Sequence, residues 1–117
     1  MTTTEAIAAL VAAGRIKSGW LPGMQAASPD GTTERYAAGD GPWLYGDRVH
    51  DINDPLTARG LELLVEEACP GAVPTWRVRL NPEWFWFLPG ADWLINEPEP
   101  TREAATEAAL VALAEAL

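Results

Sequence analysis

The sequence predicts an α+β fold, with helices near both ends and in the middle of the chain and strand-like segments between them. Apolar residues recur with helical spacing in three segments, whereas residues 76–80 alternate strictly between apolar and basic side chains. The chain has 117 residues, of which 48% are hydrophobic, and this length can bury one core without disulfides or metals. We therefore expect one domain over residues 1–117.

The first predicted helix spans about residues 3–13. Thr2 and Glu5 have the spacing of a capping box, which satisfies free N–H groups at a helix start. Apolar residues follow at i, i+3 and i+4, namely Ile7, Leu10 and Val11.

The second predicted helix spans residues 55–68 and has the sharpest start. Asp54 is a good N-cap, and Pro55 falls at the first helical position, where a missing N–H costs nothing. Its apolar stripe is Leu61, Leu64, Val65 and Ala68. Gly60 lowers the helix propensity by about 1 kcal/mol relative to Ala, so we expect another residue to pack closely against it.

The third predicted helix spans residues 101–117. Thr101 can cap it, and Glu103 favours the positive end of the helix dipole. One stripe contains Thr106, Leu110, Leu113 and Leu117, and most of the remainder is alanine. This composition favours close docking on a sheet over a free amphipathic helix.

Between the second and third helices, the sequence predicts a three-stranded antiparallel meander over residues 76–95. In the first strand, alternation directs Trp76, Val78 and Leu80 to the core and Arg77 and Arg79 away from it. Residues 84–88 and 93–95 form the next two predicted strands. Short strands within residues 34–49 complete the small antiparallel sheet that we expect against the helices.

The charge balance narrows the possible partners. Seventeen acidic residues against eight basic ones give a net charge of −9, and residues 51–117 alone hold twelve acids and four bases. Direct nucleic-acid binding requires a basic footprint, and adhesion to an anionic membrane requires the same. We expect neither, and a charged partner would be basic.

Cys69 is the only cysteine, so neither a disulfide nor a cysteine zinc site can form within the chain. We expect a packed thiol there, because free cysteine is among the most buried residue types. No apolar run reaches the roughly 18 residues that a spanning helix needs. The expectations are a cytoplasmic protein with no cofactor and no metal.

His50 is the only histidine, and Asp47, Asp51 and Asp54 flank it. This group can be interpreted as a general base or a metal site. The simpler interpretation is that acids just before a helix cap it and complement its dipole, and we favour it. A small enzyme that uses His50 is the least favoured functional hypothesis.

The stretch from Asp54 to Leu117 resembles the phage ABA sandwich domain, a family of tailed-phage and prophage proteins. The likeness lies in the Asp54-Pro55 helix start, the strand with Trp76, the aromatic meander, and the final helix that begins at Thr101. Residues 14–24 are also similar to a leader in small phage-encoded proteins. The resemblance implies helix, sheet, helix layering and an accessory phage role, and it implies no catalytic residues.

Candidate interface residues fall into three groups, which are the loop tryptophans Trp20 and Trp43, the strand arginines Arg77 and Arg79, and the acids Glu97, Glu99, Glu103 and Glu107. Tryptophan is enriched at binding hot spots, although we expect Trp76, Trp84 or Trp86 to serve the core. The arginines either stack nucleic-acid bases or, as we prefer, pair across strands with Phe85, Phe87 or acids. The acids either imitate phosphate toward a basic protein or form a solvated face.

These observations lead to a hypothesis of a non-enzymatic phage or prophage accessory protein that binds a host or phage protein. An inhibitor of a host defence system, such as an anti-CRISPR, fits the small size and acidity. The alternative is a minor virion or assembly protein that self-associates, for example as a homodimer.

Overall fold

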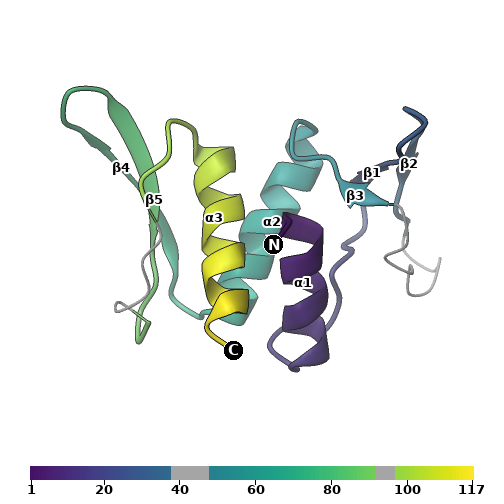
Figure 1. Ribbon diagram of the computed structural model, residues 1–117, viewed down its shortest axis with the longest axis horizontal. Coiled ribbons are helices and arrows are strands. Elements are labelled where there is room, and N and C mark those ends of the chain that lie inside the picture. The colour runs from purple at the N-terminus through teal and green to yellow at the C-terminus, as the bar shows by residue number, and fades with distance from the viewer. Residues whose placement is uncertain (38–47, 92–96) are drawn as a thin grey trace.

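A computed structural model describes residues 1–37, 48–91 and 97–117 of the chain (Figure 1). In chain order the elements are α1 (Thr3–Ala12), β1 (Gln25–Ala27), β2 (Thr33–Arg35), β3 (Val49–His50), α2 (Pro55–Ala68), β4 (Val73–Val78), β5 (Pro82–Phe87) and α3 (Arg102–Glu115). The α+β class predicted from the sequence is confirmed.

The three helices form a central layer with one small sheet on either side (Figure 1). The sheet β2-β1-β3 lies beyond α1, and the hairpin β4-β5 lies along α3. The expectation of a single sheet is therefore wrong, and so is the helix, sheet, helix layering that the resemblance implied, although the chain order α2, β4, β5, α3 does alternate in that way. The physical reason is that β1, which the sequence analysis missed, supplies the hydrogen-bonding partner for both β2 and β3.

Pairing within each sheet is antiparallel. Ala26 of β1 pairs with Glu34 of β2 on one side and with His50 of β3 on the other. Strands β2 and β3 overlap the predicted 34–49 region only at its two ends. The hairpin runs from the pair Val73 and Phe87 to the pair Val78 and Pro82. The predicted strand at 93–95 lies outside the described residues.

The helix boundaries agree with the sequence prediction to within two residues, because the predicted caps are in place. The side chains of Thr2, Asp54 and Thr101 accept hydrogen bonds from the backbone N–H groups of Glu5, Thr57 and Ala104. Within the described part of the chain, no helix combines the length and the apolar character needed to cross a membrane.

The buried side chains form one cluster between the helices. Its largest members include Ile7, Leu10, Leu61, Leu64, Leu110 and Trp86. Gly60 is covered closely, as predicted, since a Cβ placed there would lie 2.6 Å from Cε of Met24. Leu117 was expected on the buried stripe of the last helix, but it follows the end of α3 and is exposed.

The burial predicted for the first meander strand is wrong. Trp76, Val78 and Leu80 are all exposed, although Trp86 on the paired strand is buried as expected and Trp84 is half-buried. The hairpin projects past the start of α3, so only its base, with Trp86 and Leu88, is covered (Figure 1). Alternation identified the faces of the strand correctly, but burial also requires a packing partner along its whole length.

Candidate functional site

The β4-β5 hairpin carries a concentration of exposed apolar side chains, which we call the hairpin patch. It contains Val73, Trp76, Val78, Leu80 and Phe87. Trp76 is 55% exposed and Leu80 is 98% exposed. These five make up half of the large hydrophobic residues found exposed in the described part of the chain. By the strand register, Val73 and Phe87 lie on one face of the hairpin and Trp76 and Val78 on the other. Exposed apolar side chains gathered on one element mark an interaction site more often than scattered exposed leucines do.

The base of the hairpin is fixed to the helical layer. Nε1 of Trp86 donates to Oγ1 of Thr106 at 3.1 Å, and Thr106 in turn donates to the backbone carbonyl of Arg102 at 2.9 Å. The guanidinium of Arg102 lies 5.5 Å from the centre of the Trp84 ring. The exposed end of the hairpin is thus presented on a rigid support, which lowers the ordering cost of binding.

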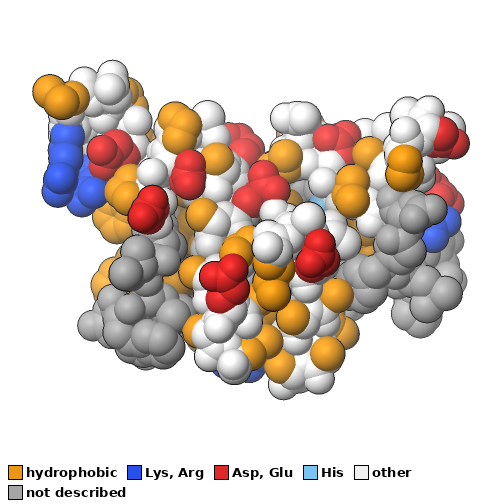
Figure 2. Space-filling view, in the orientation of Figure 1, with side chains coloured by type: hydrophobic (Ala, Val, Ile, Leu, Met, Phe, Trp, Pro, Cys, Tyr) orange, Lys and Arg blue, Asp and Glu red, His pale blue; other side chains and the backbone are white. Residues whose placement is uncertain are grey.

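The hairpin also brings two arginines together. Nε of Arg77 lies 2.9 Å from Oε2 of Glu83, and its guanidinium lies 5.0 Å from the centre of the Phe85 ring, as the cross-strand interpretation predicted. Arg79 is exposed, and within the described residues its guanidinium has no ion pair. Figure 2 shows basic side chains at this end of a face otherwise scattered with carboxylates.

The two edges of the hairpin differ. Trp84 exchanges two backbone hydrogen bonds with Glu99, both 2.8 Å, so its N–H and C=O point away from β4. Trp76 lies directly opposite Trp84, and in such a non-hydrogen-bonded pair both residues direct their backbone groups outward. Among the described residues, no segment pairs with that outward edge of β4.

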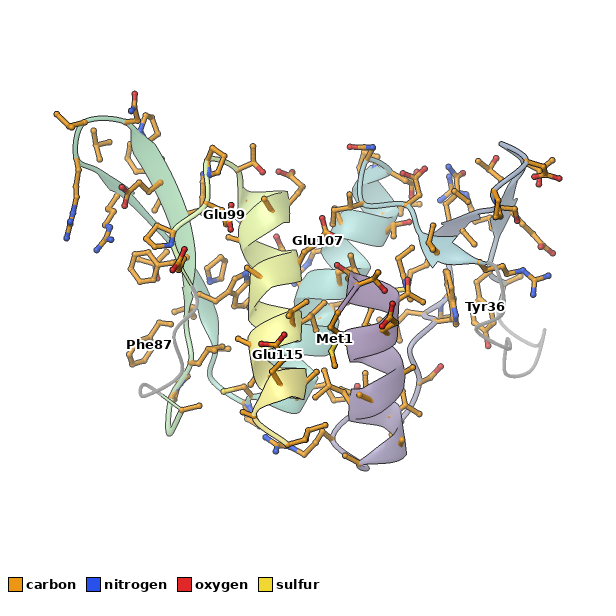
Figure 3. All side chains as sticks on the ribbon, viewed as in Figure 1. Met1, Tyr36, Phe87, Glu99, Glu107 and Glu115 are labelled. Atoms are coloured by element: carbon orange, nitrogen blue, oxygen red, sulfur yellow. The ribbon has the colours of Figure 1, made fainter. Side chains whose placement is uncertain are left out.

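The four predicted acidic residues do not form one surface. Glu97, Glu99 and Glu107 line a hollow of about 470 Å³ along α3, together with Glu115. Glu99, Glu107 and Glu115 follow one side of that helix, while Phe87 points away from it (Figure 3). Glu103 instead lines a second hollow of about 550 Å³ between α2 and the start of α3.

The second hollow contains charges that neutralise one another. Both carboxylate oxygens of Glu62 accept from Arg102, at 2.6 and 2.9 Å, and Arg59 donates to one of them at 3.0 Å. Burial raises the pKa of Glu62, but the hydrogen bonds from Arg102 and Arg59 outweigh that effect, so the pKa lies below its ordinary value. The carboxylate therefore remains ionised as a structural partner of the two arginines.

Trp20 is not the surface residue that the sequence predicted. Its side chain is 2% exposed and stacks on the ring of His50, with ring centres 3.8 Å apart. The loop that carries it packs between the helical layer and the small sheet, which a reading of turn residues alone could not reveal. Trp43 lies outside the described residues.

His50 is held on both ring nitrogens. Nε2 donates to the carbonyl of Gly19 at 2.7 Å, and Nδ1 accepts from the hydroxyl of Thr4 at 3.0 Å, since a carbonyl can only accept. Burial lowers the pKa of His50 to about 4, an effect that the bond to Gly19 opposes. A neutral, enclosed imidazole with both nitrogens bonded lacks the free position that a general base needs.

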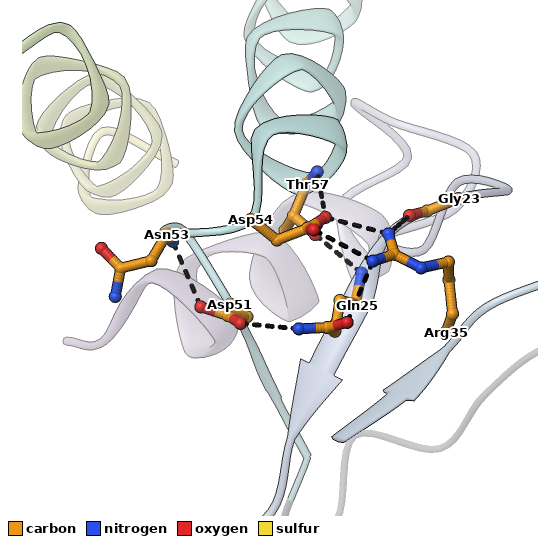
Figure 4. A network of polar contacts seen from close by, with 7 residues as sticks. All are labelled: Gly23, Gln25, Arg35, Asp51, Asn53, Asp54 and Thr57. Atoms are coloured by element: carbon orange, nitrogen blue, oxygen red, sulfur yellow. Dashed lines mark hydrogen bonds and ion pairs between the residues drawn. The ribbon is translucent and has the colours of Figure 1, made fainter.

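Asp54 caps α2, as the capping interpretation predicted, and both Asp51 and Asp54 bond residues other than His50 (Figure 4). Asp54 accepts from Thr57 and pairs with Arg35 at 3.0 Å, and these contacts hold the pKa of its carboxyl at about 2. Asp51 accepts from the side-chain amide of Gln25 at 2.9 Å. Asp47 lies outside the described residues.

In the described ranges, no arrangement of side chains is suited to nucleophilic catalysis or to metal binding. Cys69 is buried as expected, its thiol lies 3.5 Å from the carbonyl of Pro89, and burial raises its pKa. Residues 1–37, 48–91 and 97–117 contain no group of three or more His, Cys, Asp or Glu side chains placed to hold a metal ion.

Comparison with known proteins gives no match, since no family model, no curated protein and no solved structure is significantly similar to the chain. The hairpin patch therefore rests on geometry alone. Sequence reasoning found its arginines but assigned Trp76, Val78 and Leu80 to the core. The available signal was that charged and apolar residues alternate up to a turn at Asn81, beyond which the next segment is again strand-like rather than helical.

Proposed function

We propose that this protein acts by binding another protein through the hairpin patch. The observation that supports the proposal is the gathering of Val73, Trp76, Val78, Leu80 and Phe87 on one rigidly supported hairpin. Exposed apolar surface has an unfavourable free energy in water, about 25 cal/mol for each Å² that a partner could cover. Trp76 is the natural anchor, because Trp dominates the energetics of many interfaces.

The charge around the patch suits a protein partner. Arg77 and Arg79 border the apolar side chains, while the carboxylates of Glu99, beside β5, and Glu107, on α3, line one hollow on the other side of β5 from β4. Nucleic acid is a less suitable partner, because the net charge of −9 repels its phosphates. A partner that contacts both the hairpin and α3 would present apolar and basic groups.

The biological setting is part of the same proposal. A phage or prophage accessory role, with inhibition of a bacterial defence protein as the action and the host cytoplasm as the location, is supported by the resemblance of residues 54–117 together with the small size and acidity. A non-enzymatic action agrees with the enclosed state of His50.

The test is an affinity capture of partners from bacterial lysate with the tagged protein, its double variant Trp76→Ser and Leu80→Ser, and a matched control, Leu56→Ser. Leu56 is exposed to 60% at the start of α2 and lies outside the patch. A specific partner should be retained by the wild type and the control and lost by the double variant. Equal retention by all three would contradict the proposal.

A second candidate function, self-association in an assembly, is favoured by one specific feature, the open edge of β4.

A further inference from the structure

As far as the described residues go, the outward edge of β4 presents unpaired backbone groups from alternate residues. By the register with β5, these residues are Pro74, Trp76 and Val78. Trp76 and Val78 each offer an N–H and a C=O, whereas Pro74 offers only its C=O. β4 is also the outermost element on its side of the molecule, so no helix blocks the approach to this edge (Figure 1). An open edge of this kind is a template for another strand.

The sequence of β4 is compatible with antiparallel pairing to a second copy of itself. When the twofold axis passes between the two Trp76 residues, these residues exchange two backbone hydrogen bonds. The N–H of Val78 then donates to the carbonyl of Pro74 in the second copy, and the reciprocal bond forms by symmetry. The missing N–H of Pro74 thus leaves this register with four intermolecular hydrogen bonds.

Charge disfavours the neighbouring register that is centred on Arg77. A shift that centres the axis on Arg77 would place two guanidinium groups directly opposite each other, which is destabilising. In the register centred on Trp76, Arg77 faces Thr75 of the second copy instead. The carboxylates of Glu99 and Glu107 stay on the far side of β5 and do not meet across the axis.

The side chains complement one another in the same register. On one face, the two Trp76 rings become neighbours and each is backed by Trp84 of its own chain. On the other face, Arg79 lies opposite Val73 of the second copy, whose own cross-strand partner is Phe87.

We infer that two copies pair along β4, in antiparallel register about Trp76, so that their hairpins form one four-stranded sheet across a twofold axis. The inference rests on the proposed role of the hairpin as a protein-binding surface and names a second copy as an occupant. A second copy fits this edge because one register brings Val73, Trp76 and Val78 into the new strand pair while keeping the two Arg77 side chains from facing each other. Leu80 stays at the exposed tip.

The experiment is sedimentation equilibrium of the full chain over a wide concentration range, with the variants Val78→Pro, Trp76→Glu and Leu56→Ser. The wild type should show a reversible monomer–dimer equilibrium. Val78→Pro removes two of the four intermolecular bonds and should weaken the dimer roughly tenfold or more. Trp76→Glu, which sets two carboxylates against each other, should act in the same direction if the proline variant does not fold.

Leu56→Ser is the matched control, since it removes exposed apolar surface outside the hairpin and should leave the dissociation constant unchanged. A wild type that stays monomeric at every concentration, or a dimer that Val78→Pro and Trp76→Glu leave intact, would overturn the inference. Partner capture by a monomeric Val78→Pro protein separates the two proposals, because hetero-association through the patch would then persist without self-pairing.

Discussion

The imidazole of His50 lies face to face with the indole of Trp20, with ring centres 3.8 Å apart and ring planes within 8° of each other. The ring of His50 also bonds the carbonyl of Gly19, 31 positions earlier in the chain. This bond holds the Trp20 loop against β3. Thr4 of α1 closes the arrangement, because its hydroxyl accepts from the backbone N–H of His50 and donates to Nδ1. The histidine thus joins the first helix, the Trp20 loop and β3.

The buried His50 predicts a specific loss of stability in mild acid. Its pKa is lowered from 6.5 to about 4, so the unfolded chain binds the proton first as the pH falls. Stability is complete above pH 6.5 and declines toward pH 4, by about 2 kcal/mol between pH 7.5 and pH 5. Urea denaturation at a series of pH values measures this change.

The matched variant for this prediction is His50→Gln. It should be less stable than the wild type at pH 7.5 but should lack the decline between pH 6.5 and 4. Asp54, with its pKa held at about 2 by Arg35, adds a separate loss only at lower pH, where its carboxyl becomes protonated. Parallel curves for the wild type and His50→Gln would contradict the assignment.

Local signals in the sequence predicted the helices well. Capping by Thr2, Asp54 and Thr101 is decided by side chains within three residues of the N–H groups they serve, so residue spacing is sufficient information. The β4-β5 pairing was also predictable in part, because alternation and a short turn are local features.

Tertiary contacts could not be predicted from the same signals. β1 has only three residues, and it becomes a strand because β2 and β3 flank it. The burial of Trp20 depends on His50, and the exposure of Trp76 depends on where α3 begins. The candidate interface therefore moved from the loop tryptophan to the end of the hairpin, while the predicted Arg77 and Arg79 remained within it.

Gly60 and Met24 should be energetically coupled. Gly60→Ala gains about 1 kcal/mol of helix propensity but places a methyl group 2.6 Å from Cε of Met24, and overpacking typically costs 1–3 kcal/mol. We expect a net loss of about 1 kcal/mol in the wild type. In a Met24→Ala background the obstructing atoms are gone, so Gly60→Ala should stabilise by up to about 1 kcal/mol.

A double-mutant cycle from urea denaturation measures this coupling between Gly60 and Met24. The same sign and size for Gly60→Ala in both backgrounds would show that the two residues are not in contact.

Cys69 should react slowly in the folded protein. Its side chain is buried at the end of α2, its thiol contacts the carbonyl of Pro89, and burial raises the thiol pKa, so the thiolate is scarce. We expect modification by a thiol reagent at neutral pH to be at least roughly tenfold slower than in denaturant. Equal rates in the two states would place the thiol at the surface.

Trp76 and Trp86 provide a matched pair that separates folding from binding. They lie on paired strands and on the same face of the hairpin, but Trp86 is 1% exposed and Trp76 is 55% exposed. Trp86→Ala should cost about 3–5 kcal/mol, because it opens a cavity against α3 and removes the hydrogen bond to Thr106. Trp76→Ala should change the free energy of unfolding by less than about 1 kcal/mol.

In association assays Trp76→Ala should be the more damaging of the two variants, which is the reverse of their order in stability. Trp76→Ala should weaken both partner capture and self-association while its denaturation curve stays near that of the wild type, since the indole contributes contact area without supporting the core. Association of both variants is measured under conditions in which Trp86→Ala is still mostly folded. The folded Trp86→Ala protein then still presents Trp76. If Trp76→Ala proved as destabilising as Trp86→Ala, the exposed ring would be a folding element and the hairpin patch would lose its anchor.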